Sequence, residues 1–126
     1  MIEENFTCQQ LYVSPNTLKL EKPNTSYIDQ LSVDDIAFKN KFINLIKKEL
    51  TVEIDSYKKA ISNKEYLKAS QLVHRLKHKV SILGLKKGYN LALDFENELK
   101  ENTNSFASKE KFDKMLNKMV KFLECL

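Results

Sequence analysis

The sequence predicts an all-α protein: an antiparallel up-and-down four-helix bundle, preceded by a short helix and an extended N-terminal arm. Three observations lead to this prediction. No proline, the residue that most disrupts a helix interior, follows Pro23. The chain has only 2 Gly, which disfavours turn-rich β architectures. Four long segments repeat apolar residues at helical spacing and are joined by short polar stretches, the pattern of a bundle.

Length and composition place this bundle in one domain. The chain has 126 residues, of which 42% are hydrophobic, enough to build a single core. Both prolines and the loop-like stretches around them lie near the start of the chain. Residues 1–26 are therefore predicted to form the arm, with residues 27–126 forming the bundle.

The first two helices follow the arm. Residues 27–31 form the short entry helix. Asp34 or Asp35 then caps a long helix, because a carboxylate before the first turn accepts a free helix-end N–H. The inner face of this long helix repeats every three or four residues, at Phe42, Ile46, Leu50, Ile54, Tyr57 and Ile61.

Three further helices complete the bundle. Ser62 and Glu65 fit the spacing of a capping box, which predicts the start of the third helix, and Gly84 supplies its C-cap after Leu83. The inner arc of this helix is Ala69, Leu72, Val73, Leu76, Val80 and Leu83. Residues 86–101 and 108–125 form the last two helices. The inner face of the last helix is Phe112, Met115, Met119, Phe122 and Leu126, and Gly88 in the fourth permits close helix contact.

Charge, apolar runs and cysteine spacing indicate the cellular compartment in which the protein is expected. The net charge is +4, and the longest strictly apolar run has three residues, against about 20 for a membrane span. No secretory signal is visible, and Cys8 and Cys125 show neither metal nor redox spacing. These features favour a reduced, cytoplasmic protein without a membrane segment.

One stripe of the third helix carries unusual residues. A helical wheel places His74, Lys77, His78 and Ser81 opposite the apolar arc, so they are expected to face solvent, with Lys79 at the edge of the arc. Both histidines and the only arginine, Arg75, fall within five consecutive residues.

The stretch from His74 to Gly84 resembles the signature of histidine-containing phosphotransfer (HPt) domains. The resemblance lies in the histidine, Leu76 two residues later, Lys77 three residues later, and the pair Leu83-Gly84 nine and ten residues later. Residues 72–99 carry this motif-level likeness, and the helix layout of residues 27–126 is similar to that of the family.

The resemblance implies a carrier in a multistep His–Asp phosphorelay. His74 would accept a phosphoryl group from, and return it to, the aspartates of response-regulator receiver domains, including those of hybrid sensor kinases. Lys77 would support the phosphoryl oxygens, and Glu96 matches the position that orients the other imidazole nitrogen. Arg75, His78 and Ser81 would contact the partner.

The same resemblance limits what the chain itself is expected to bind and to catalyse. The chain would bind no cofactor of its own, Mg²⁺ would come from the receiver, and no autokinase activity is expected because no Gly-rich ATP loop is present. A monomer is expected, since one bundle uses its apolar faces internally. Basic residues at this end would steer an acidic receiver, namely Arg75, Lys77, Lys79, Lys86 and Lys87.

His78 departs from the family pattern, which usually has glycine four residues after the phosphoacceptor. One helical turn separates these positions, so the imidazole of His78 is expected beside His74. It could narrow the choice of receiver or act as a second cationic group for the phosphoryl anion. If it blocks productive docking, the chain is a non-transferring adaptor that binds receiver or kinase domains.

Two other functions fit the sequence less well. His74 and His78 could ligate one metal ion, with Glu96 or Glu98 completing the site, but no H-E-x-x-H motif is present. A nucleic-acid binder is disfavoured by the modest net charge of +4, by the single arginine and by lysines that are spread over all helices.

Overall fold

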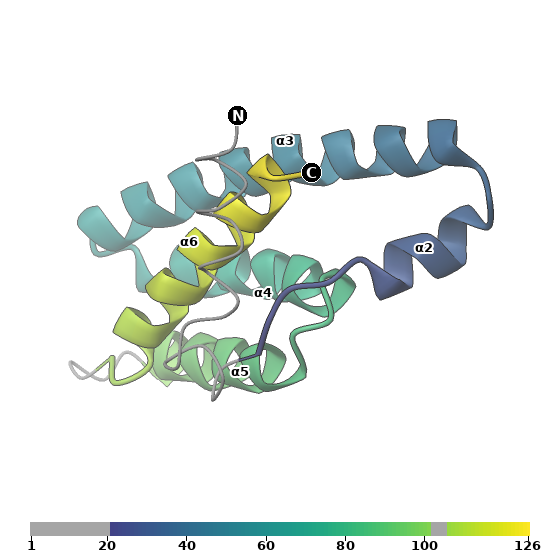
Figure 1. The fold of residues 1–126 in the computed structure, drawn as a ribbon. Coiled ribbons are helices and arrows are strands. Elements are labelled where there is room, and N and C mark those ends of the chain that lie inside the picture. The colour runs from purple at the N-terminus through teal and green to yellow at the C-terminus, as the bar shows by residue number, and fades with distance from the viewer. Residues whose placement is uncertain (1–20, 102–105) are drawn as a thin grey trace.

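The computed structural model describes residues 21–101 and 106–126, and the protein is all-helical over these residues. The described helices are α2 (Ser26–Ser32), α3 (Ile36–Ser62), α4 (Tyr66–Ile82), α5 (Lys86–Glu101) and α6 (Lys109–Glu124). Figure 1 shows α3 along one side of the molecule and α4 and α5 side by side, and α6 packs against α3 and α5. No strand occurs among these residues.

The sequence located most helix boundaries. The bounds of α2, α5 and α6 agree with the predicted ranges to within one residue at each end. Asp35 caps α3 as predicted, because its Oδ1 accepts the backbone N–H of Phe38 at 3.0 Å. Ile46, Leu50 and Tyr57 of the predicted inner face are buried, and the rest of that face is partly buried.

The turn between α3 and α4 differs from the prediction. Ser62 is the last residue of α3, and α4 begins after Glu65 without a side-chain cap, so the predicted capping box does not form. The N–H of Lys64 donates to the Ile61 carbonyl (3.1 Å) and the N–H of Glu65 to the Ala60 carbonyl (2.8 Å). These two bonds end α3 in a Schellman motif. Ser62 belongs to this helix end, so it does not act as the N-cap of α4.

The turn between α4 and α5 repeats this geometry with the predicted glycine. Gly84 has a φ of 78° and its N–H donates to the Ser81 carbonyl (3.0 Å), while Leu85 donates to the Val80 carbonyl (3.2 Å). A Cβ on Gly84 would collide with the side chain of Asn24. The chain just before α2 therefore packs directly on this turn, held by the Asn24 N–H bond to the Leu83 carbonyl (2.8 Å).

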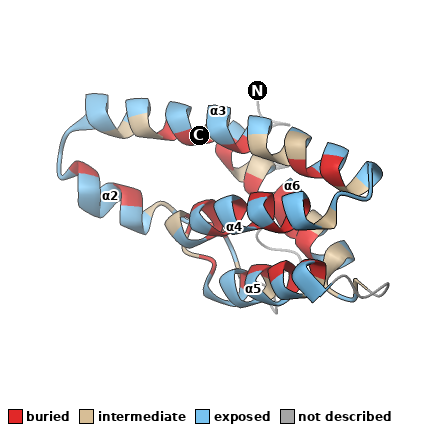
Figure 2. Ribbon diagram, turned by 180° about the vertical axis from the view of Figure 1, so that it is seen from behind, coloured by how far each residue is buried: buried red, intermediate tan, exposed pale blue. Residues whose placement is uncertain are grey.

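An aromatic cluster joins α3, α5 and α6. The ring of Tyr57 meets Phe95 and Phe112 edge-on, with centroids 6.1 and 5.6 Å apart, and Phe95 lies 5.2 Å from Phe112. The hydroxyl of Tyr57 donates to Asp113 Oδ1 at 2.7 Å, which satisfies the one polar atom of this buried side chain. Figure 2 shows buried residues on the faces that the helices turn toward one another.

The predicted inner arc of α4 is confirmed, because all six of its residues are buried. On α6 the prediction needs one correction. Phe112, Met115 and Met119 are buried, but Leu126 is exposed and Leu123 takes the last inner position. The helix ends at Glu124, so the backbone at Leu126 no longer follows the helical period.

Gly88 lets α5 and α6 approach closely, as predicted. A Cβ at this position would occupy the space of the Met115 sulfur. Glu98 of α5 accepts hydrogen bonds from the backbone N–H (3.2 Å) and the hydroxyl (2.7 Å) of Ser108, the residue before α6. The C-terminal half of α5 is therefore anchored to the first turn of α6.

The predicted arm lies mostly outside the described residues, since the description begins at Glu21 and residue 26 already belongs to α2. Cys125 corrects the expectation of reduced cysteines: it is disulfide-bonded. Cys8 lies outside the described residues.

Candidate functional site

The site is centred on His74, at the middle of α4 where this helix faces α5. Half of the His74 side chain is exposed (52%). Its Nδ1 lies 3.1 Å from Oε2 and 3.4 Å from Oε1 of Glu96 on α5. The structure thus brings His74 and Glu96 together, from two different helices, as their predicted roles require.

Glu96 is a buried carboxylate with several cationic partners. Lys77 Nζ lies 2.9 Å from Oε1 and Lys100 Nζ lies 3.2 Å from Oε2. Burial raises the pKa of Glu96, but the hydrogen bonds from Lys77 and Lys100 and the charges of Lys77 and His74 outweigh it. The net pKa lies below the ordinary value, so Glu96 is ionised at neutral pH.

An ionised carboxylate fixes the tautomer of His74. Such a group can only accept hydrogen bonds, so the nitrogen that faces it, Nδ1, must carry the hydrogen. In the neutral imidazole the lone pair then resides on Nε2, on the other side of the ring. The arrangement therefore yields a histidine with an oriented ring and a nucleophilic Nε2 on a half-exposed side chain.

Lys77 is not on the exposed stripe, and this part of the prediction is wrong. Its side chain is only 6% exposed and is directed to Glu96. Its Nζ also lies 5.4 Å from the ring centroid of Tyr89, a cation–π contact. The flexible lysine stem lets the ammonium reach a partner on α5, which a wheel drawn for α4 alone cannot include.

The three residues predicted to contact the partner are exposed. Arg75, His78 and Ser81 all face solvent on α4. The ring of His78 stands nearly perpendicular to that of His74, with centroids 5.1 Å apart. The expected position of His78 beside the phosphoacceptor candidate is therefore confirmed.

The predicted basic end is smaller than expected. Lys79 is buried between α4 and α3, where Nζ lies 3.0 Å from both Glu49 Oε1 and Glu53 Oε2. Burial lowers the pKa of Lys79, but the hydrogen bonds and charges of the two glutamates raise it by more than burial lowers it. The net pKa lies above the ordinary value, so Lys79 stays charged. Lys77 and Lys79 are buried and paired with carboxylates. Of the basic residues predicted at this end, Arg75, Lys86 and Lys87 therefore remain exposed.

Two residues of the site were not predicted. Lys100 contacts the same carboxylate as His74, and Tyr89 covers Lys77. The spacing of four between Glu96 and Lys100 is a readable signal of a helical ion pair. Tyr89 has no comparable signal, because its contact depends on how α4 and α5 pack.

Glu98 does not approach the two histidines, since it is engaged by Ser108. Over residues 21–101 and 106–126 no group of three or more His, Cys, Asp or Glu is placed to hold a metal ion. No helix in the same residues is long and apolar enough to cross a membrane.

Comparison of the chain with protein-family models, with curated proteins and with solved structures finds no match. The resemblance to HPt domains therefore rests on the residues of the motif, and the geometry around His74 is independent of it.

Proposed function

We propose that this protein carries a phosphoryl group on Nε2 of His74 and passes it between the aspartates of receiver domains, as an intermediate of a multistep His–Asp phosphorelay. The observation that carries this proposal is the 3.1 Å contact of Glu96 with Nδ1. It leaves Nε2 as the nucleophile on a side chain that a partner can reach. The HPt-like spacing of residues 74–84 adds support from the sequence.

The chemistry needs few groups from the carrier. The Nε2 lone pair attacks the phosphorus of the phosphorylated aspartate, the P–O bond breaks, and the aspartate leaves as a carboxylate. The hydrogen on Nδ1 stays in place, so the ring gains positive charge, which the ionised Glu96 stabilises. Transfer onward reverses these steps. The receiver supplies Mg²⁺ and most of the catalysis, and the carrier has no autokinase activity.

Lys77 acts mainly through Glu96 in this proposal. Its 2.9 Å contact keeps the carboxylate ionised and in place. Lys77 contacts the carboxylate on the Nδ1 side of the ring, whereas the phosphoryl group would be on Nε2, so direct support of the phosphoryl oxygens by Lys77 stays a prediction. Arg75, His78 and Ser81 form the exposed surface that receives the partner.

The proposal includes the finer architecture of a monomer with an antiparallel up-and-down bundle. Its support is the pattern of helix packing, in which α3 packs on α4, α4 on α5, α5 on α6, and α6 on α3. These pairs close a ring of four helices, as in a four-helix bundle. The short helix α2 packs on α3.

The test is phosphorylation of the full chain, first by phosphoramidate and then by receiver domains phosphorylated on aspartate with Mg²⁺. The mass of one added phosphoryl group, labile to acid and stable to alkali, is expected on the wild type and absent from His74→Gln. His78→Gln is the matched control, because it removes the other histidine and leaves His74 intact. A label that persists in His74→Gln contradicts the assignment.

One observation favours a second candidate, the adaptor that binds receivers without transfer. The His78 ring lies 5.1 Å from that of His74, where HPt domains usually have glycine. For the adaptor, receivers bind the full chain, but no phosphoryl group moves from their aspartates to His74. Phosphoramidate separates the two cases, since this small donor needs no docking surface.

A further inference from the structure

A cavity of about 440 Å³ opens between α5, α6 and residues 21–23. His74, Lys77 and Glu96 of the candidate site do not line it, whereas Lys87 of the basic end does. Its volume falls within the range of pockets that hold small molecules, about 300–1,000 Å³. The lining residues are Glu21, Pro23, Leu85, Lys87, Gly88, Leu91, Lys111, Lys114, Met115 and Lys118.

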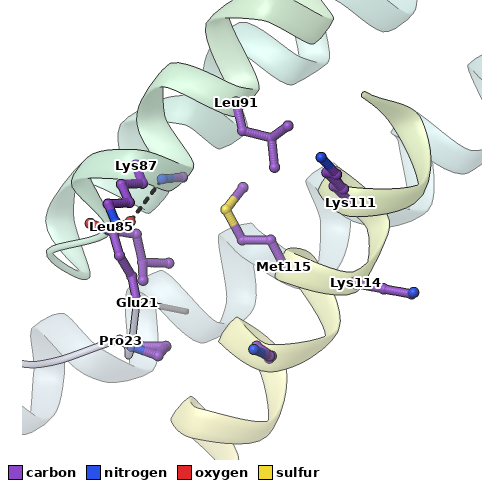
Figure 3. A pocket seen from close by; sticks show the side chains of 10 residues that line it. Glu21, Pro23, Leu85, Lys87, Leu91, Lys111, Lys114 and Met115 are labelled. Carbon is purple, nitrogen blue, oxygen red and sulfur yellow. Dashed lines mark hydrogen bonds between the residues drawn. The ribbon is translucent and has the colours of Figure 1, made fainter. Parts of the chain in front are cut away.

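The floor of the cavity is apolar. Leu85 and Met115 are buried, and Leu91 is partly buried. Figure 3 shows Leu91 and Met115 facing each other from α5 and α6. Gly88 has no side chain, so the Met115 sulfur packs against the helix backbone and forms part of the floor. An apolar chain can therefore be removed from water along this floor.

The rim of the cavity is basic. Of its four lysines, Lys114 pairs with Glu110 at 3.2 Å. Lys87, Lys111 and Lys118 have no ion-pair partner in the part of the chain that the structure describes. Burial lowers the pKa of Lys118, which means that its charge lacks compensation where it stands.

One acid lines the cavity. Glu21 Oε1 accepts the backbone N–H of Gly88 at 2.8 Å, in the first turn of α5 (Figure 3). Its carboxylate is thus engaged by the helix end, and three lysine charges at the rim remain without a partner. The cavity combines an apolar floor with an excess of positive charge.

We propose that this cavity binds a small amphipathic anion, an apolar chain that ends in a carboxylate. The chain would lie against Leu85, Leu91 and Met115, and the carboxylate would lie among the lysines of the rim. A protein partner fits less well, because a stable protein interface buries about 1,600 Å² in total, far more surface than a cavity of this size offers.

Calorimetric titration of the full chain with decanoate tests the proposal, with decanol and acetate as ligands that have only the chain or only the charge. We expect saturable binding of one decanoate and much weaker binding of the other two. The double variant Lys111→Gln/Lys118→Gln should bind decanoate about tenfold or more weakly, because two charge-assisted contacts are removed. Lys48→Gln/Lys58→Gln, on the exposed face of α3, is the matched control and should bind as the wild type does.

Circular dichroism and thermal melting of each variant show that the fold is kept. Absence of saturable decanoate binding overturns the proposal. So does equal weakening in both double variants, since the attraction would then come from net charge alone. Binding of decanol as tight as that of decanoate overturns the assignment of an anion. None of these outcomes depends on phosphorylation of His74, so this proposal and the proposed function can fail separately.

Discussion

Replacing Glu96 with glutamine is expected to lower the free energy of unfolding by about 3 kcal/mol. Glutamine keeps the shape of the side chain but removes the charge that Lys77 contacts at 2.9 Å. Both side chains are only 6% exposed, and removing one partner of a buried pair costs about 3–5 kcal/mol. The lower end applies because the amide oxygen of glutamine still accepts a hydrogen bond. Lys100 is 53% exposed and can turn to water, so its lost pairing adds only about 0.3–0.5 kcal/mol.

Thermal and urea unfolding measure this loss. For 126 residues, an unfolding entropy of about 2.1 cal/mol/K per residue sums to roughly 0.26 kcal/mol/K, so a loss of about 3 kcal/mol should lower Tm by about 11 °C. Asp94→Asn is the matched control. It removes the same charge from an exposed position of the same helix, and its effect should stay within about 0.5 kcal/mol.

The double variant Glu96→Gln/Lys77→Met identifies the cause. If the cost comes from an unpaired ammonium, replacing Lys77 with an apolar side chain of similar length should recover most of the lost stability. A Glu96→Gln variant within about 1 kcal/mol of the wild type would refute the reasoning, because Lys77 could then not be held in a buried pair.

Three further predictions concern pH, backbone conformation and His78. The pKa of Glu96 in the folded protein lies below its ordinary value of 4.5. The stabilising contribution of Glu96 is therefore complete above pH 4.5 and is lost as the pH falls through the folded-state pKa. The urea midpoints of wild type and Glu96→Gln should then converge in acid. Lys64→Gly should raise the free energy of unfolding by about 1 kcal/mol in urea titration, since Lys64 has a φ of 57°, whereas Asn63→Gly, at a φ of −86°, should give no gain. His78→Gly should speed transfer from phosphorylated receivers to His74, measured by rapid quench, if the imidazole narrows docking; an unchanged rate contradicts that role.

The fold was largely readable from the sequence because local patterns determined it. Gly84 marked the end of α4 because glycine adopts a positive φ without cost. The end of α3 has the same hydrogen bonds, but the position equivalent to Gly84 is Lys64. No residue type in the sequence therefore indicated where α3 ends. The local sequence allows Ser62 either to end α3 or to begin a capping box for α4. In the structure α3 extends through Ser62, so the capping box does not form.

The site was readable only in part, because its decisive contacts join two helices. The wheel of α4 placed His74 correctly on the exposed side but put Lys77 there too. Lys77 is buried because Glu96 on α5 offers a carboxylate within reach of its stem. The motif spacing pointed to Glu96 as the partner of the histidine, whereas the burial of that carboxylate, and hence its second partner, depends on how α5 packs on α4.

The same carboxylate serves stability and the proposed chemistry, so loss of transfer in Glu96→Gln alone cannot be assigned to orientation of the ring. Lys100→Gln separates the two effects. Lys100 contacts Glu96 Oε2, the oxygen that also faces His74 Nδ1, but it is half exposed and its removal leaves Lys77 paired. Stability should change by less than about 0.5 kcal/mol. With one cation fewer, Oε2 is a stronger acceptor for Nδ1–H, and the positive ring of phosphohistidine is better stabilised. Lys100→Gln should therefore slow the loss of the phosphoryl group from His74, and an unchanged lifetime would mean that Glu96 does not act on the phosphorylated ring.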